Sequence, residues 1–95
     1  MNELRNTFKT LINDILPATY QSPVRFNHCF NRVILDWLFG DAWYHHLDKK
    51  KTAISQLNEE QLQSAIARMH EWMTQHDSLI RDNQNSLRYR GKLKE

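Results

Sequence analysis

LNEEQL, residues 57–62, is the stretch that decides the fold, because it combines two signals for the start of a helix. Asn58 can cap the helix, and the side chain of Gln61 can reach back to the cap amide in a capping box. Leu57 can pack against Leu62 across the same helix start as a hydrophobic staple. Further apolar residues then recur at helical spacing, at Ala65, Ile66, Met69, Trp72 and Met73. The sequence therefore predicts an amphipathic helix that packs against other helices.

The same periodicity predicts helices on either side of this one. The expected helices cover residues 2–16, 23–39, 42–50, 59–75 and 78–89. We expect Pro17 to end the first helix, and Ser22 and Pro23 to begin the second. Gly40 suits the left-handed position that closes the second helix, and Asp41 can cap the third. No glycine or proline separates the last two helices, so one long bent helix is the alternative to a break between them.

These elements predict an all-α fold, a single-domain bundle of four to five helices. The bundle domain is expected over residues 1–87, with a basic C-terminal tail over residues 88–95. The second helix has the broadest apolar face, so we expect it to be central. A chain of 95 residues has a small core, although three Trp, three Tyr and four Phe enlarge it. Association with a second copy or a partner would bury more surface.

Charge and composition restrict the class of protein. The net charge of +2 is weak for a dedicated DNA binder. A single cysteine, Cys29, cannot form an intrachain disulfide, and we expect it to fill the core as a small apolar side chain. The first residues lack the pattern of a secretory signal, and no apolar run is long enough to span a membrane. The sequence predicts a soluble, cytoplasmic protein.

A polar stripe on the second helix, continued beyond Gly40, is the predicted partner or ligand surface. Its residues are Arg25, His28, Arg32, Asp36, Trp43, Tyr44 and His45. Tryptophan, tyrosine and arginine are frequent anchors of protein interfaces. The alternative is an ion pair between Arg32 and Asp36 at helical spacing, with the other groups solvated.

We predict no catalytic residue, no metal site and no cofactor. The best candidate for metal binding is Asp41, His45 and Asp48, which would share one stripe of the third helix, but a cap and two solvated side chains explain the same residues. Adjacent His45 and His46 would diverge by about a hundred degrees on a helix. Cys29 and His28 are also adjacent, so they would point apart rather than form a nucleophile and its base.

A second candidate surface is basic. The possible nucleic-acid contacts are Lys49, Lys50, Lys51, Arg88, Tyr89, Arg90, Lys92 and Lys94. Lysine and arginine neutralise phosphates, and the tyrosine ring would be available to stack on a base. Charge runs in a loop and at a terminus also serve solubility, so both interpretations stay open.

Five short strings carry a resemblance to a known group of proteins. They are Phe26-Asn27-His28-Cys29-Phe30, Trp43-Tyr44-His45-His46-Leu47, Gln61-Leu62, Asp82-Asn83 and Leu87-Arg88-Tyr89-Arg90. The chain resembles small uncharacterised bacterial proteins, some of which carry a label of GNAT-type acetyltransferase. That label implies a mixed sheet and a glycine-bearing loop for acetyl-CoA. The only glycines of this chain are Gly40 and Gly91, with no Gly-x-Gly motif.

The function expected from the sequence is a non-catalytic protein-interaction or regulatory module that forms oligomers. A nucleic-acid-binding helical protein that uses the basic loop and tail is the alternative. An acetyltransferase-related or metal-dependent small enzyme is a third hypothesis, and we expect the protein not to be an enzyme.

Overall fold

The computed structural model describes residues 2–20 and 27–91 as one all-α domain, with no strand in these ranges. In chain order the elements are α1 (Asn2–Thr10), η1 (Leu11–Ile15), α2 (Leu16–Thr19), α3 (Asn27–Phe39), η2 (Trp43–His45), η3 (Ile54–Gln56), α4 (Glu59–Thr74) and α5 (His76–Tyr89). The predicted fold class is confirmed. The mixed sheet that an acetyltransferase label implies is not formed by these residues.

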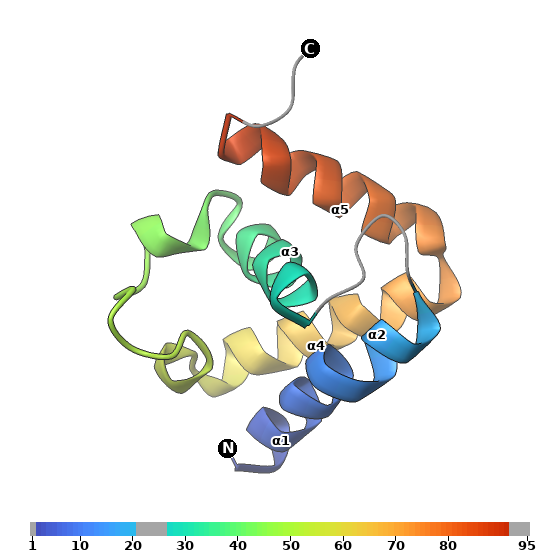
Figure 1. The fold of residues 1–95 in the computed structure, drawn as a ribbon. Helices are drawn as coiled ribbons and strands as arrows, with labels where there is room; N and C mark the ends of the chain where they lie inside the picture. The colour runs from blue at the N-terminus through green and yellow to red at the C-terminus, as the bar shows by residue number, and fades with distance from the viewer. Residues whose placement is uncertain (1, 21–26, 92–95) are drawn as a thin grey trace.

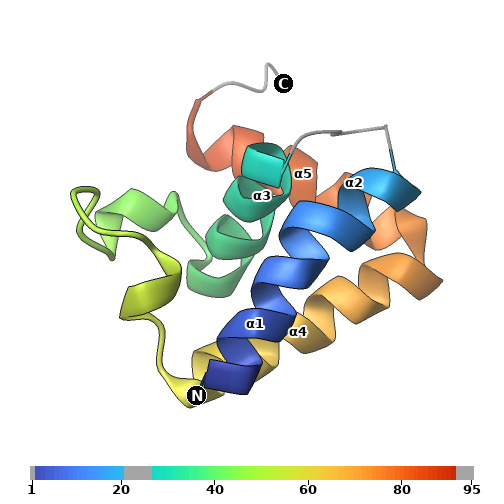
Figure 2. The same ribbon diagram turned by 60° about the horizontal axis from the view of Figure 1, so that its bottom comes forward.

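Helix α3 is central, as expected from its broad apolar face. It contacts η1, α2, α4 and α5, and α1 packs against α4 (Figures 1 and 2). Most fully buried side chains of this core come from α3 and α4. They are Phe30, Val33, Ile34, Leu35, Leu62, Ala65, Met69 and Trp72, and Leu16 and Leu79 join them from α2 and α5. Cys29 is a free, half-buried thiol packed against the same core, in agreement with its expected role as a filler.

The start of α4 has the predicted capping geometry. The amide of Gln61 donates to Oδ1 of Asn58 at 2.8 Å, and the amide of Asn58 donates to Oε1 of Gln61 at 2.9 Å. Leu57 is 2% exposed and Leu62 is 0% exposed, and both belong to the core. The capping box therefore fixes where the chain leaves the preceding loop and enters the bundle.

Pro17 does not end the first helix, and that prediction is wrong. The α-helix of α1 passes into a π-helical turn, η1, and the chain continues through Pro17 to Thr19 in α2. In a regular α-helix the ring of Pro17 would clash with the carbonyl of Asn13 and remove one backbone hydrogen bond. The amide of Leu16 donates instead to the carbonyl of Leu11, five residues back, and this wider turn accommodates the proline.

The second helix ends as expected, and the third is largely absent. α3 ends at Phe39, and Gly40 takes the left-handed conformation with φ +64°; the predicted start at Pro23 lies outside the described residues. The expected helix over residues 42–50 is reduced to the 3-10 turn η2. The carboxylate of Asp48 accepts the amide of Lys50 at 2.9 Å, a local hydrogen bond that competes with continued helix.

The last two helices are separate, which resolves the alternative left open by the sequence. Gln75 alone separates α4 from α5, with φ −135° and ψ 88°. In a continuous helix the amide of His76 would donate to the carbonyl of Trp72. That carbonyl instead accepts the hydroxyl of Tyr20 at 2.9 Å, and the Tyr20 ring stacks on His76 with centroids 4.6 Å apart. The end of α2 thus occupies the helix break.

None of the helices described is long and apolar enough to cross a membrane.

Replacing the cap of α4 tests the role of the capping box. We expect Asn58→Ala to lower the free energy of unfolding by about 1 kcal/mol, because the amide of Gln61 loses its acceptor. For a domain of this size that corresponds to a fall of about 4–8 °C in the melting temperature by circular dichroism. Asn58→Asp, which keeps an acceptor, is the matched control and should melt near the parent. An unchanged melting temperature for Asn58→Ala would show that the cap is dispensable.

Candidate functional site

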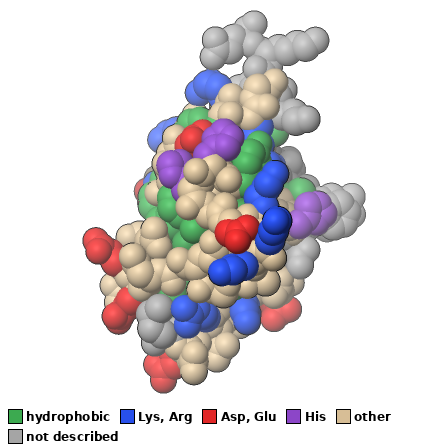
Figure 3. All heavy atoms as spheres, turned by 90° about the vertical axis from the view of Figure 1, so that its left-hand side faces the viewer, with side chains coloured by type: hydrophobic (Ala, Val, Ile, Leu, Met, Phe, Trp, Pro, Cys, Tyr) green, Lys and Arg blue, Asp and Glu red, His purple; other side chains and the backbone are tan. Residues whose placement is uncertain are grey.

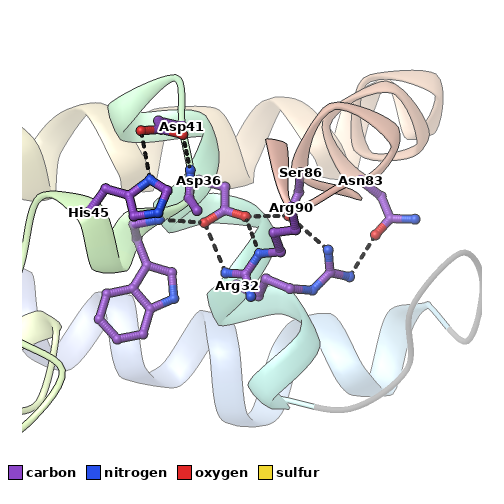
Figure 4. Close-up of polar contacts among 9 residues, drawn as sticks. Arg32, Asp36, Asp41, His45, Asn83, Ser86 and Arg90 are labelled. Carbon is purple, nitrogen blue, oxygen red and sulfur yellow. Dashed lines mark hydrogen bonds and ion pairs between the residues drawn. The ribbon is translucent and has the colours of Figure 1, made fainter. Parts of the chain in front are cut away.

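Asp36, on the last turns of α3, is fully buried and accepts hydrogen bonds from two other parts of the chain (Figure 4). The hydroxyl of Ser86 donates to Oδ2 at 2.5 Å, and Arg90 donates from Nε at 2.8 Å and from Nη2 at 3.1 Å. The backbone amide of Trp43 donates to Oδ1 at 2.9 Å. One carboxylate therefore joins α3, the end of α5 and the turn η2.

Arg32 does not form the expected ion pair with Asp36. It donates from Nη1 to the hydroxyl of Ser86 at 2.7 Å and from Nη2 to Oδ1 of Asn83 at 2.8 Å. Burial lowers the pKa of Arg32, and the positive charge of Arg90 lowers it further. An arginine remains charged at neutral pH even so. Ser86 thus lies between the two groups, because it accepts from Arg32 and donates to Asp36.

The residues of the predicted partner surface do not all lie at the surface of the molecule. Arg32 and Asp36 point toward α5, and Asp36 is 0% exposed, so including it in a contact surface was wrong. Trp43 and Tyr44 are half-buried and His45 is exposed in the segment after α3. The remaining members lie at the start of α3 or before it: His28 is exposed, and Arg25 lies outside the described residues.

The segment between α3 and α4, residues 40–58, is referred to here as the α3–α4 loop. Its aromatic centre is Tyr44, which packs edge-on against Trp43 and His45 at centroid distances of 6.0 and 4.9 Å. Two cations face the ring of Tyr44: Nζ of Lys49 at 5.4 Å and Cζ of Arg90 at 5.1 Å from its centroid. Cation–π contacts of this kind hold a half-exposed ring in place.

Two histidines converge on one carboxylate in this loop, contrary to the expectation that they diverge. Nδ1 of His45 lies 3.0 Å from Oδ2 of Asp41, and Nε2 of His46 lies 3.3 Å from the same oxygen. They converge because the chain leaves helical geometry after η2. His46 also stacks on Phe39 with centroids 5.0 Å apart. The hydrogen bond with His45, followed by that from the amide of Ala42, lowers the pKa of Asp41.

The candidate metal cluster is not assembled. In the part of the chain that is described, no group of three or more His, Cys, Asp or Glu side chains is placed to hold a metal ion. Asp41 is engaged by His45 and His46, whereas Asp48 accepts the amide of Lys50. The third helix that would have aligned Asp41, His45 and Asp48 on one stripe is not formed.

Gln56 holds the tip of the α3–α4 loop. Its Oε1 accepts the amide of Asp48 at 2.8 Å, and its Nε2 donates to the carbonyls of Asp48 at 2.9 Å and Thr52 at 3.2 Å. The lysines at positions 49–51 lie on this held turn and are exposed. Figure 3 views the face on which the loop lies, where apolar side chains lie among histidine, basic and acidic ones.

The predicted nucleic-acid contacts divide into exposed side chains and side chains that are engaged within the fold. Lys49, Lys50, Lys51 and Arg88 are exposed, and Tyr89 is 38% exposed. Arg88 also donates to Asn85 at 2.9 Å, and the side chain of Arg90 is only 18% exposed because it pairs with Asp36. Residues 88–90 therefore belong to the folded bundle rather than to a tail. Lys92 and Lys94 lie outside the described residues.

A second buried carboxylate, which the sequence did not single out, links α4 to α5. Asp82 accepts Nε of Arg68 at 2.7 Å, Nη2 of the same arginine at 2.9 Å and the indole of Trp72 at 2.7 Å. Arg68 also packs over Trp37, 5.3 Å from the ring centroid, and its hydrogen bond with Asp82 raises its pKa. The available signal was the helical spacing of the small polar residues Ser78, Asp82 and Ser86 on the face of Leu79.

Comparison with known proteins gives no relative: no protein-family model, curated protein or solved structure matches this chain. No pocket is detected among the residues described. The surface features of the α3–α4 loop are therefore the basis for a functional proposal.

The Asp36 contacts are tested by an isosteric substitution. We expect Asp36→Asn to lower the free energy of unfolding by about 3–5 kcal/mol, because it leaves Arg90 partly buried without its counter-ion. Urea unfolding monitored by tryptophan fluorescence measures the change. Asp14→Asn removes the same charge from an exposed site in η1 and should alter stability by less than about 0.5 kcal/mol. Equal stability of the two variants would contradict a structural role for Asp36.

The lowered pKa of Asp41 has a defined consequence for stability. Because the pKa is lower in the folded state, ionised Asp41 stabilises the fold above the unfolded value of about 3.9, and this contribution is lost as pH falls through the folded pKa. We expect carbon-detected NMR to give a titration midpoint below the usual range. His45→Phe should raise that midpoint, whereas His70→Phe, an exposed histidine on α4, should leave it unchanged. A midpoint unaffected by His45→Phe would refute the assigned hydrogen bond.

Proposed function

We propose that this protein is a small non-catalytic interaction module and that the α3–α4 loop is the surface that contacts its protein partner. The observation that carries this proposal is that a long loop, whose only regular elements are the short 3-10 turns η2 and η3, is held by hydrogen bonds from side chains. Loops longer than about 12–15 residues are uncommon in compact domains, and those that are ordered usually serve binding or catalysis.

The loop is prepared for binding because contacts hold it at three places. Asp36 accepts the amide of Trp43 near its start, Asp41 accepts the amide of Ala42 beside it, and Gln56 bonds the backbone at its tip. A surface that is already ordered loses less conformational entropy when a partner binds. The same contacts explain why a loop with only two short 3-10 turns keeps a defined shape.

The side chains of the loop are those found at the centre of protein interfaces. Trp43 and Tyr44 are half-buried, so each keeps one part packed and offers another to a partner. Aromatic residues contribute large contact area with few rotatable bonds, and they are enriched among the residues that dominate binding energy. His45 and His46 flank them as exposed polar groups.

The titratable groups near the loop support a binding role rather than catalysis. Asp36 is saturated by donors from Ser86, Arg90 and Trp43, and Asp41 is shared by two histidines. A general base needs free access to a substrate proton. These carboxylates are instead committed to holding the loop and α5.

Self-association and a cytoplasmic location belong to the same proposal. A domain this small has a limited core, so contact with a second copy would add buried surface. The single cysteine, Cys29, is free and half-buried against the core, which is compatible with a reducing compartment.

Site-specific photo-crosslinking in the native cells tests the proposal. A photoreactive amino acid replaces exposed His45 in the loop, and in the control it replaces exposed Gln75 between α4 and α5. We expect one dominant adduct from position 45, either with a second copy or with another protein, and no such adduct from position 75. Light scattering of the purified protein over a range of concentrations identifies self-association. A strictly monomeric protein with no adduct specific to position 45 would refute the proposal.

A further inference from the structure

We infer that the segment recognised by the α3–α4 loop is an acidic stretch of polypeptide. This inference rests on the proposed interaction function and adds the chemistry of the partner. It follows from the charges that the loop carries and from the contacts that each charged group makes.

The carboxylates of the loop are occupied. Asp41 is contacted by His45 and His46 and by the amide of Ala42, and Asp48 accepts the amide of Lys50. These hydrogen bonds hold both carboxylates against the loop itself. The loop carries three lysines against two aspartates, so its net charge is positive.

The lysine ammonium groups of the loop, in contrast, are not held by carboxylates of the described residues. The three lysines at positions 49–51 are exposed, and none forms an ion pair with a carboxylate among residues 2–20 and 27–91. Lys49 lies over the ring of Tyr44, which directs its charge toward the aromatic centre of the loop. The uncompensated charge of this surface is positive, and it adjoins the half-buried Trp43 and Tyr44.

The backbone that carries the three lysines is also held by hydrogen bonds. Gln56 bonds the backbone at Asp48 and Thr52, on either side of the three lysines, so their side chains leave from one held turn. Figure 3 shows cationic side chains near histidine and apolar groups on this face. Fixed positive groups beside an aromatic surface fit a short run of glutamates or aspartates with neighbouring apolar residues.

Nucleic acid fits these positions less well. A phosphate backbone requires a continuous basic stripe, but Arg90 is neutralised by Asp36 and withdrawn from the surface. Stacking on a base requires an open aromatic face, whereas the ring of Tyr44 is covered by Lys49 and Arg90.

Binding of model ligands to the full chain tests the inference. The probes are a fluorescein-labelled oligoglutamate peptide, a neutral serine–glycine peptide of equal length and a labelled oligothymidylate, all followed by fluorescence anisotropy. We expect oligoglutamate to bind with an affinity that falls about tenfold when salt rises from about 50 to about 200 mM. The neutral peptide should not bind, and oligothymidylate should bind more weakly than oligoglutamate.

Matched double variants locate the binding surface. Lys50→Gln with Lys51→Gln should weaken oligoglutamate binding about tenfold, because two exposed ammonium groups are lost from the loop. Lys9→Gln with Arg81→Gln removes two exposed charges from α1 and α5 and should bind as the parent does. Circular dichroism verifies that both double variants are folded.

Two results would overturn the inference. One is equal affinity of the parent and of the Lys50/Lys51 double variant for oligoglutamate; the other is tighter binding of oligothymidylate, which would favour a nucleic-acid partner. The crosslinking at position 45 separates this outcome from failure of the proposed function. If that adduct forms while oligoglutamate binding fails, only the acidic chemistry of the partner is wrong. If both fail, the interaction proposal falls as well.

Discussion

The buried carboxylate of Asp36 is the contact on which the arrangement of the molecule depends. An isolated charge in the interior is strongly unfavourable, and it is tolerated only when hydrogen-bond donors and an opposite charge surround it. Ser86 on α5 and Arg90 directly after this helix supply those donors, and the amide of Trp43 supplies another from the α3–α4 loop. Satisfying one group therefore positions α5 and the start of the loop at the same time.

Helix α5 joins the bundle mainly through polar contacts, unlike the other helices. Its buried residues are Ser78, Leu79, Asp82, Asn83 and Ser86, of which only Leu79 is apolar. Apolar packing is tolerant of small shifts, whereas a buried polar network is stable only when every member finds its partner. The pairs Asp36–Arg90 and Asp82–Arg68 thus determine the position of α5 more narrowly than hydrophobic contact alone.

This dependence connects the interior to the candidate binding surface. Arg90 pairs with Asp36 inside the fold and also faces the ring of Tyr44 in the loop. The same arginine that satisfies a buried charge therefore supports the aromatic centre of the surface. The loop itself contributes three consecutive exposed lysines at positions 49–51.

The sequence by itself determined the helical class and the central position of α3, and it also located the start of α4 at Asn58 and the end of α3 at Gly40. These features follow from caps, left-handed glycines and apolar periodicity, which act between near neighbours in the chain. Only the tertiary structure decided the partners of Asp36, Arg32 and Asp82, the passage through Pro17 and the loss of the third helix. The side-chain partners of Asp36 and Arg32 lie some fifty positions away in the chain. The π-helical turn before Pro17 and the hydrogen bond between Asp48 and Lys50 are local, but apolar spacing does not distinguish them from α-helix. A carboxylate at helical spacing looks the same whether it meets solvent or an arginine some fifty positions away, as with Asp36 and Arg90.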